Sequence, residues 1–219
     1  MVILMLGAQG TGKGTIAGLL SKKTGFPQIS TGDIFRRNIA EKTELGKKAN
    51  EYIAAGNLVP DEITVPMVIG RLNEEDAKAG AILDGFPRTV EQAEKLDEIL
   101  KEQGKQVDWV INLTTPRDEI ITRILNRRVC PNCKATYNLT MHPPKTEGIC
   151  DDCGTALEQR EDDSNAESIQ NRLNIYDEKT SPLVHYYEKK GVITTQEVSE
   201  RINHLGKDVA EEVYEEFIK

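Results

Sequence analysis

The sequence predicts an α/β fold in which helices flank a parallel sheet of five strands. Short apolar runs alternate with longer segments of helical period along most of the 219 residues, as is typical of strands joined by right-handed helical crossovers. The first run, Val2 to Leu6, is apolar throughout, which indicates a strand covered on both faces. A glycine-rich turn then leads into a helical segment, the usual first unit of such a fold.

Local signals place the individual elements. Ser30 with Asp33, and Thr89 with Gln92, form capping boxes that open two helices. Prolines inside two other helical segments are expected to bend them. Strands are expected at residues 2–6, 26–30, 81–84, 107–113 and 192–195. Helices are expected at residues 13–25, 34–42, 44–56, 61–73, 90–104, 117–128, 168–190 and 206–219.

Composition narrows the class of function. The net charge of −8 disfavours a partner held mainly through phosphate-backbone contacts, so no nucleic-acid partner is expected. No apolar run approaches the roughly 18 residues that span a bilayer, and no membrane partner is expected. The apolar N-terminus lacks a basic region and runs into glycines, so we expect a core strand, not a signal peptide, in a cytoplasmic protein. No apolar stripe demands a dimer, and a monomer is expected.

The stretch "GAQGTGKGT" between the first strand and first helix predicts a phosphate-binding loop. Lys13 can reach the outer phosphates of a nucleotide, and Thr15 would place a hydroxyl near its magnesium ion. Gly14 stands between them, so the match is to a subclass of the motif. The alternative is a glycine turn that closes the strand–helix unit without a ligand. Glycines let the backbone amides turn inward at Gly7, Gly10, Gly12 and Gly14.

All four cysteines lie in one short segment. They form two C-x-x-C pairs separated by 16 residues, a spacing typical of a tetrahedral zinc site. A redox pair or two strained disulfides are the alternatives, and a reducing compartment disfavours the disulfides. The expected metal ligands are Cys130, Cys133, Cys150 and Cys153.

Six ordered blocks resemble the adenylate kinase family over essentially the whole chain. They are "GAQGTGKGT" at Gly7, "ISTGDIFRR" at Ile29, "AGNLVPDE" at Ala55, "ILDGFPRTVEQA" at Ile82, "RILNRRVCPNC" at Arg123 and "QREDD" at Gln159. The resemblance implies a P-loop kinase with a helical AMP-binding insertion and a long lid of the metal-binding bacterial type. It implies MgATP, AMP and ADP as substrates and products, with Mg²⁺ and a structural Zn²⁺ as cofactors.

The resemblance also implies roles for individual residues. ATP would contact Gly10, Thr11, Gly12, Lys13, Gly14, Thr15, Arg127, Thr136 and Tyr137. AMP would contact Thr31, Arg36, Ile53, Asn57, Leu58, Val59, Gly85, Arg88, Gln92, Arg160 and Arg172. The catalytic set would be Lys13, Arg88, Arg123, Arg127, Arg160 and Arg172, because phosphoryl transfer needs cations already placed around the spreading charge.

For several residues, the sequence itself gives a physical reason for the role that the resemblance implies. Asp84 ends a strand beside the phosphate-binding loop, where a carboxylate can hold magnesium through water, although it could simply cap a helix. Gln92 offers both a donor and an acceptor to an adenine edge, or completes the capping box. Arg123 and Arg127 are expected four apart on one helix, and so on one face. Arg128 faces elsewhere and is expected to be a surface charge.

The cysteine segment is too short to form its own core without a metal, since units below about 40 residues usually need one. We therefore expect a zinc-stabilised lid at residues 127–164 that excludes water during transfer. The AMP-binding insertion is expected at residues 30–59. The core would comprise residues 1–29, 60–126 and 165–219.

Departures from the family pattern leave some points open. Gln9 replaces a usual proline, Ile16 a frequent glutamine, and Ser164 lengthens the spacing before Arg172 by one residue. "VSERI" at 198–202 replaces a turn that often supports adenine, so that contact is left unassigned. The alternatives are a kinase for UMP or CMP, a zinc-ribbon nucleic-acid module fused to an NTPase, and a silent nucleotide-binding scaffold. The three histidines, His142, His185 and His204, are given no role.

Overall fold

The computed structural model describes residues 1–199 and 206–217, and its centre is a sheet of five parallel strands, as predicted. The strand order is β2-β3-β1-β4-β7, so the first strand lies in the middle. Leu4 faces Leu83 on one side and Val110 on the other. The strands are β1 (Val2–Leu6), β2 (Gln28–Ser30), β3 (Ala81–Asp84), β4 (Trp109–Thr114) and β7 (Ile193–Glu197).

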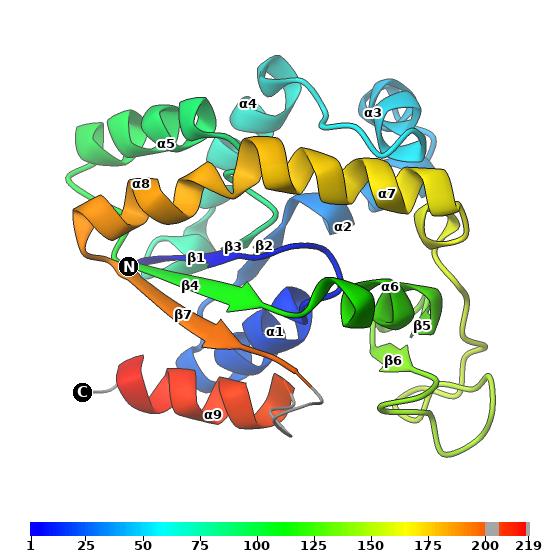
Figure 1. Cartoon of the computed structure of the whole chain (residues 1–219). Helices are drawn as coiled ribbons and strands as arrows, with labels where there is room; N and C mark the ends of the chain where they lie inside the picture. Colours follow the sequence, from blue (N-terminus) through cyan, green and yellow to red (C-terminus); the bar gives the residue numbers. More distant parts are fainter. Residues whose placement is uncertain (200–205, 218–219) are drawn as a thin grey trace.

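Helices cover both faces of this sheet (Figure 1). Successive side chains of β1 point to opposite faces, so Leu4 packs under α4, α5 and α8, whereas Ile3 packs against α1 and α9. Both residues are fully buried. These helices are α1 (Lys13–Thr24), α4 (Asp61–Leu72), α5 (Val90–Glu102), α8 (Pro182–Lys190) and α9 (Gly206–Phe217).

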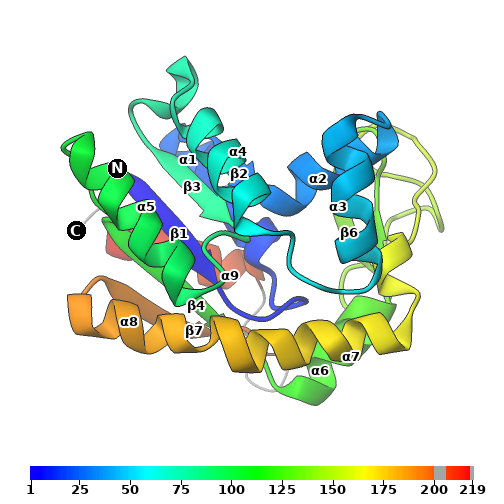
Figure 2. The same cartoon turned by 90° about the horizontal axis from the view of Figure 1, so that it is seen from above.

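Two insertions project from the carboxyl ends of the strands (Figure 2). The first contains α2 (Thr31–Ala40) and α3 (Glu44–Ala54), which pack around a small apolar cluster of their own. Ser30 caps α2 by accepting from the Asp33 N–H at 3.3 Å, as its capping box predicts. The chain then enters α4, which continues through Pro66.

The cysteine segment forms the second insertion. Its short antiparallel pair joins β5 (Arg127–Val129) to β6 (Thr136–Asn138). Cys130, Tyr137 and Cys150 make a separate buried cluster there.

The helix expected at 117–128 is shorter than predicted. It is α6 (Arg117–Leu125), and Asn126 caps it, after which Arg127 and Arg128 lie in β5. The Asn126 carbonyl accepts from the Leu139 N–H at 3.0 Å, and Arg127 pairs with Asn138. The prediction that Arg123 and Arg127 share one helical face is therefore wrong, because strand pairing within the insertion ends the helix first.

One long helical segment runs from the cysteine insertion back to the sheet (Figure 1). It begins as α7 (Ala166–Ile175), passes through a π-helical turn (Tyr176–Thr180) and continues as α8. Pro182 is the first residue of α8, so the expected break falls at that junction. None of the helices within residues 1–199 and 206–217 has the length and apolar character needed to cross a membrane.

Candidate active site

The loop after β1 is folded tightly against β4. Gly7 has φ of +132°, and a Cβ there would lie 2.4 Å from the Leu113 carbonyl oxygen, so only glycine fits. The Lys13 ammonium group donates to the carbonyls of Gly7 at 2.8 Å and Ala8 at 2.7 Å. The loop therefore wraps around its own lysine at the N-terminus of α1, where backbone N–H groups favour anions.

Lys13 has an unusually low pKa. Burial of the ammonium group lowers the pKa to about 8, which the nearby Asp84 carboxylate partly opposes. The positive charges of Arg88, Arg127 and Arg172 act in the same direction as burial. Burial and mutual repulsion thus destabilise the positive charges at this site, and a bound polyanion would stabilise them.

Asp84 and the threonines of the loop take different positions. Asp84 lies at the end of β3, and a Cβ on Gly14 would lie 3.5 Å from its Oδ2 atom, so the carboxylate faces the start of α1. Thr15 lines the open cleft and is exposed. Thr11 is buried and donates to the Ala8 carbonyl at 2.9 Å, so its side chain stabilises the loop and lies outside the cleft.

A cleft of about 1700 Å³ lies between the phosphate-binding loop and the cysteine insertion. It brings together residues from distant segments that the sequence analysis assigned to ATP, to magnesium and to the transferred phosphoryl group. Those that line it are Gly10, Gly12, Lys13, Gly14, Thr15, Asp84, Arg88, Arg123, Arg127, Thr136, Tyr137, Arg160 and Arg172.

A smaller cavity of about 50 Å³ lies beside this cleft. Ten of the eleven residues assigned to AMP line it, and Arg160 lines the larger cleft instead. The sequence analysis missed Gly32, Phe35 and Thr64, which also line it. Phe35 follows Thr31 by four positions on α2, and this spacing on one helical face could have found it. The ten are Thr31, Arg36, Ile53, Asn57, Leu58, Val59, Gly85, Arg88, Gln92 and Arg172.

The turn after β3 holds this smaller cavity in shape. Gly85 has φ of +82°, and a Cβ there would lie 2.7 Å from the Thr31 hydroxyl oxygen. Thr31 donates to the Gly85 carbonyl at 3.0 Å, and the Arg88 Nε–H donates to the same carbonyl at 2.8 Å. Burial lowers the pKa of Arg88 to about 10, with Arg172 adding to the effect. One carbonyl thus positions two of the side chains that line the cavity.

Gln92 is buried at the inner wall of the smaller cavity. Thr89 caps α5 by accepting from the Gln92 N–H at 3.2 Å, so half of the expected capping box forms. The Gln92 side chain does not return to Thr89. Its Oε1 atom accepts from the Arg88 N–H at 2.8 Å, and its Nε2 atom donates to Asp61 Oδ1 at 2.6 Å.

Two buried carboxylates organise the arginines. Arg127 contacts Asp163 through two hydrogen bonds of 2.7 and 2.6 Å, and Arg172 lies 2.5 Å from Asp162. Although burial raises the pKa of Asp162, the surrounding arginines, Arg172 foremost, outweigh it and lower the pKa. Sequence reasoning assigned neither aspartate a role, although the quoted block "QREDD" contains both.

The remaining arginines differ in setting. Burial lowers the pKa of Arg160 to about 10, and the charges of Arg127 and Arg36 add to it. Arg123 is 8% exposed and lies 3.2 Å from Glu119 on the same helix. Arg128 donates to the backbone carbonyls of Leu125 and Arg127 and does not line either cavity, as expected of a residue outside the site.

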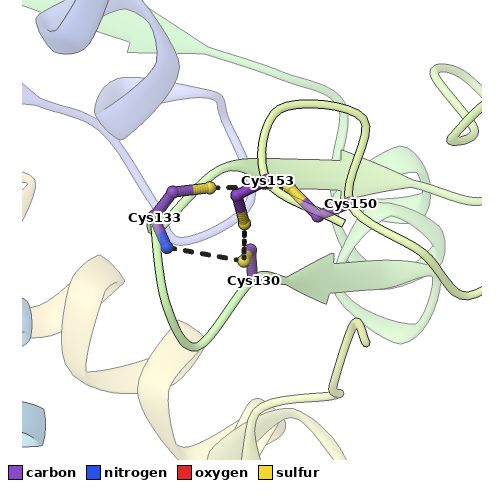
Figure 3. A group of neighbouring side chains, drawn as sticks. All are labelled: Cys130, Cys133, Cys150 and Cys153. Carbon is purple, nitrogen blue, oxygen red and sulfur yellow. Dashed lines mark hydrogen bonds between the residues drawn. The ribbon is translucent and has the colours of Figure 1, made fainter. Parts of the chain in front are cut away.

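The four cysteines converge as their spacing predicts (Figure 3). Their Sγ atoms all lie within 4.8 Å of one another, and the thiols are free. Separations of 3.4 Å for Cys130–Cys153 and 3.5 Å for Cys133–Cys150 exceed a disulfide bond and suit sulfur atoms that share one ion. Four thiolates are the donor set that a structural zinc ion prefers, so the residues fit such an ion.

Tyr137 is buried in the cysteine insertion. Its hydroxyl accepts from the Asp151 N–H at 2.8 Å and lies 3.5 Å from Cys150 Sγ. Its ring stacks on His142, with centroids 6.4 Å apart. His142 and His185, to which no role was assigned, are exposed, and His142 lines the larger cleft. His204 and residues 200–202 of the unassigned adenine contact lie outside the described residues.

Comparison with known proteins supports a single family. The family model described as adenylate kinase matches residues 5–192. An adenylate kinase of Acetivibrio thermocellus is 52% identical over 209 residues, which cover 95% of this chain and 96% of that protein. Adenylate kinases of Caldicellulosiruptor bescii and Staphylococcus aureus are each 48% identical, over 95% of this chain and 97% of those proteins. The chain belongs to the adenylate kinase family.

Proposed function

We propose that this protein catalyses the reversible, magnesium-dependent transfer of the terminal phosphoryl group of ATP to AMP, which gives two ADP and balances the adenine nucleotides. As a member of the adenylate kinase family it is an ATP:AMP phosphotransferase. The observation that carries the assignment of the site is the junction of the two cavities. Arg36, Arg88 and Arg172 line both the cleft of the phosphate-binding loop and the smaller cavity.

In this proposal ATP occupies the larger cleft and AMP the smaller cavity, and their phosphates meet at the shared arginines. Two anions held in line by fixed cations need no nucleophile or general base, because an AMP phosphate oxygen is already negatively charged. Lys13 and Arg127 face the transferred group from the ATP side. Arg88 and Arg172 face it from the AMP side.

Magnesium is the metal that this family uses with its nucleotides, and when bound it neutralises charge on the phosphates. Asp84 would hold it through water, and Thr15 would stand close by. The carboxylate faces Gly14 at the start of α1, which fits that task.

The lid of residues 127–164 supplies the third part of the site. We propose that it closes over ATP to exclude water, and that one structural zinc ion holds it together through the four cysteines. Its separate buried cluster of Cys130, Tyr137 and Cys150 supports treating it as a unit. Helices α2 and α3, with their own cluster, support a separate AMP-binding unit at 30–59 that covers the other substrate.

We further propose that the protein acts as a monomer in the cytoplasm, without a nucleic-acid partner. The acidic balance of the chain supports the last point, because the counterion-releasing surface of a nucleic-acid-binding protein is basic. Gel filtration with light scattering tests the monomer. A gel shift in low salt tests nucleic-acid binding.

The deciding experiment measures ADP formed from MgATP with AMP, beside UMP, CMP and GMP. We expect AMP to be the preferred acceptor. Arg127→Ala should lower kcat by at least about a hundredfold, as loss of a cation at a transferring phosphoryl group does. Arg128→Ala is the matched control, because Arg128 is the next residue along the chain but lines neither cavity, and this variant should keep nearly full activity. Failure to interconvert adenine nucleotides, or full activity in a Lys13→Ala, Arg88→Ala double variant, would contradict the proposal.

A further inference from the structure

The two neighbours of the Gln92 side chain fix which way its amide points. The Arg88 backbone N–H can only donate, and it lies 2.8 Å from Oε1. The Asp61 carboxylate accepts, and it lies 2.6 Å from Nε2. If the amide were rotated by 180°, two N–H groups would face each other at one end and two oxygens at the other.

The hydrogen-bond inventory of Gln92 then leaves a defined remainder. A side-chain amide has two N–H donors and two acceptor lone pairs. Arg88 uses one lone pair and Asp61 uses one donor, so one acceptor position and one donor position remain. Gln92 is 2% exposed and lines the smaller cavity, so only a ligand in that cavity can use them.

Purine bases differ in the order of these groups. Adenine carries an amino donor at position 6 and an acceptor at N1, whereas hypoxanthine and guanine carry an oxygen acceptor at position 6 and an N–H donor at N1. A locked amide therefore pairs with one kind of base and opposes the other. A freely rotating amide would pair with both.

We propose that Asp61 is a specificity-determining positioning residue, which locks the Gln92 amide so that the site accepts 6-aminopurine and rejects 6-oxopurine nucleotides. The inference deepens the proposed function and rests on it. Asp61 lines neither cavity, and so acts only through Gln92.

The setting of Asp61 supports this role. It is the first residue of α4, and its side chain is 31% exposed. One carboxylate oxygen accepts from Gln92, while the other lies 3.8 Å from the ammonium group of Lys95 on α5. The Asp61 carboxylate on α4 thus lies between two residues of the neighbouring helix α5, Gln92 and Lys95.

Glu62 provides a matched control. It carries a carboxylate in the same first turn of α4, where both acids interact with the helix N-terminus, but it is exposed. Asp61→Asn keeps the shape of the side chain and replaces the obligatory acceptor by an amide that can also donate. Glu62→Gln makes the same chemical change beside it.

The test compares AMP with IMP, a 6-oxopurine nucleotide without a 2-amino group, as acceptors for MgATP. We expect Asp61→Asn to reduce the ratio of kcat/KM for AMP to kcat/KM for IMP by about tenfold, the effect of losing one charged hydrogen bond. KM for MgATP should stay unchanged, and Glu62→Gln should keep the wild-type ratio. Calorimetric titration with AMP and with IMP repeats the comparison without turnover.

The outcomes are distinct. A wild-type AMP/IMP ratio in Asp61→Asn, even with a lower melting temperature or a higher KM for AMP, would make Asp61 a structural residue only and overturn the inference. Equal loss of the ratio in Glu62→Gln would overturn it too, since the effect would then be one of charge at the helix end. A wild-type protein that forms no ADP from AMP would instead refute the proposed function, and the inference with it.

Discussion

The charge of Lys13 should set the alkaline limit of ATP capture. Its pKa of about 8 in the free protein means that about nine-tenths of the molecules carry the charge at pH 7, and about one-tenth at pH 9. The protonated form is the one that attracts phosphate oxygens, so raising the pH weakens capture. We therefore expect kcat/KM for MgATP to fall about tenfold from pH 7 to pH 9.

The value of kcat should behave differently. Bound phosphates stabilise the charged lysine and raise its pKa, so kcat at saturating MgATP should stay level over the same range. The last ionisation of a phosphate group has a pKa near 6, about two pH units below the expected fall in kcat/KM. The pKa values of Arg88 and Arg160, about 10, place their own titration above it.

The assay measures initial rates of ADP formation by chromatography, because coupling enzymes have pH profiles of their own. AMP is kept saturating and MgATP is kept below its KM. Lys13→Arg is the control, since its guanidinium stays protonated, and its reduced kcat/KM should show no limb near pH 8. A wild-type kcat/KM that stays level to pH 9.5, or a limb that persists in Lys13→Arg, would refute this reasoning.

Further substitutions test the lid and the turns. A chelator or Cys150→Ser should lower the melting temperature and leave weak activity in the cold; complete loss of activity in a folded, metal-free protein would contradict a structural metal. Gly85→Ala should destabilise by about 1–3 kcal/mol more than Gly148→Ala in urea titrations, because both glycines have positive φ but only Gly85 would bring its Cβ within 3 Å of a side-chain oxygen. Asp163→Ala should cost about 3 kcal/mol and lower kcat, since it leaves the partly buried Arg127 without its carboxylate; an unchanged urea midpoint would argue against that pair.

Local patterns in the sequence predict most of the fold and most of the residues that line the two cavities. The phosphate-binding loop and the strand that ends in Asp84 are contiguous motifs, and parallel strands bring their carboxyl ends to one edge of the sheet. Thr31 and Gly85 line the smaller cavity for this reason, because they follow β2 and β3 directly, and eight further residues that resemblance assigned to AMP line it with them. The position of the Thr11 side chain could not be predicted, because spacing does not tell which residue of a loop turns inward and donates to the Ala8 carbonyl.

Non-local pairing accounts for what the sequence could not predict. In the sequence the helical pattern runs through Arg127 without a clear break, whereas in the structure the helix ends at Leu125 and Asn126 caps it. The strand that Arg127 joins is completed by Thr136–Asn138, on the far side of a cysteine loop, so helical period alone gives the wrong face. In the same way, the roles of Asp162 and Asp163 could not be predicted, because their pairs with Arg172 and Arg127 form only when separate elements pack together.

Helix α7 connects parts of the molecule that lie far apart along the chain (Figure 2). Asn171 donates to the Ala55 carbonyl and the Asn57 side chain, and Gln9 donates to the carbonyl of Ile169. Together with the Arg172–Asp162 pair, these contacts join α7, a helix of ten residues, to the cysteine insertion, to the insertion that contains α2 and α3, and to the phosphate-binding loop. A lid grafted from a related kinase should therefore bring α7 with it, because a graft cut at the lid alone would separate Arg172 from the carboxylates of Asp162 and Asp163.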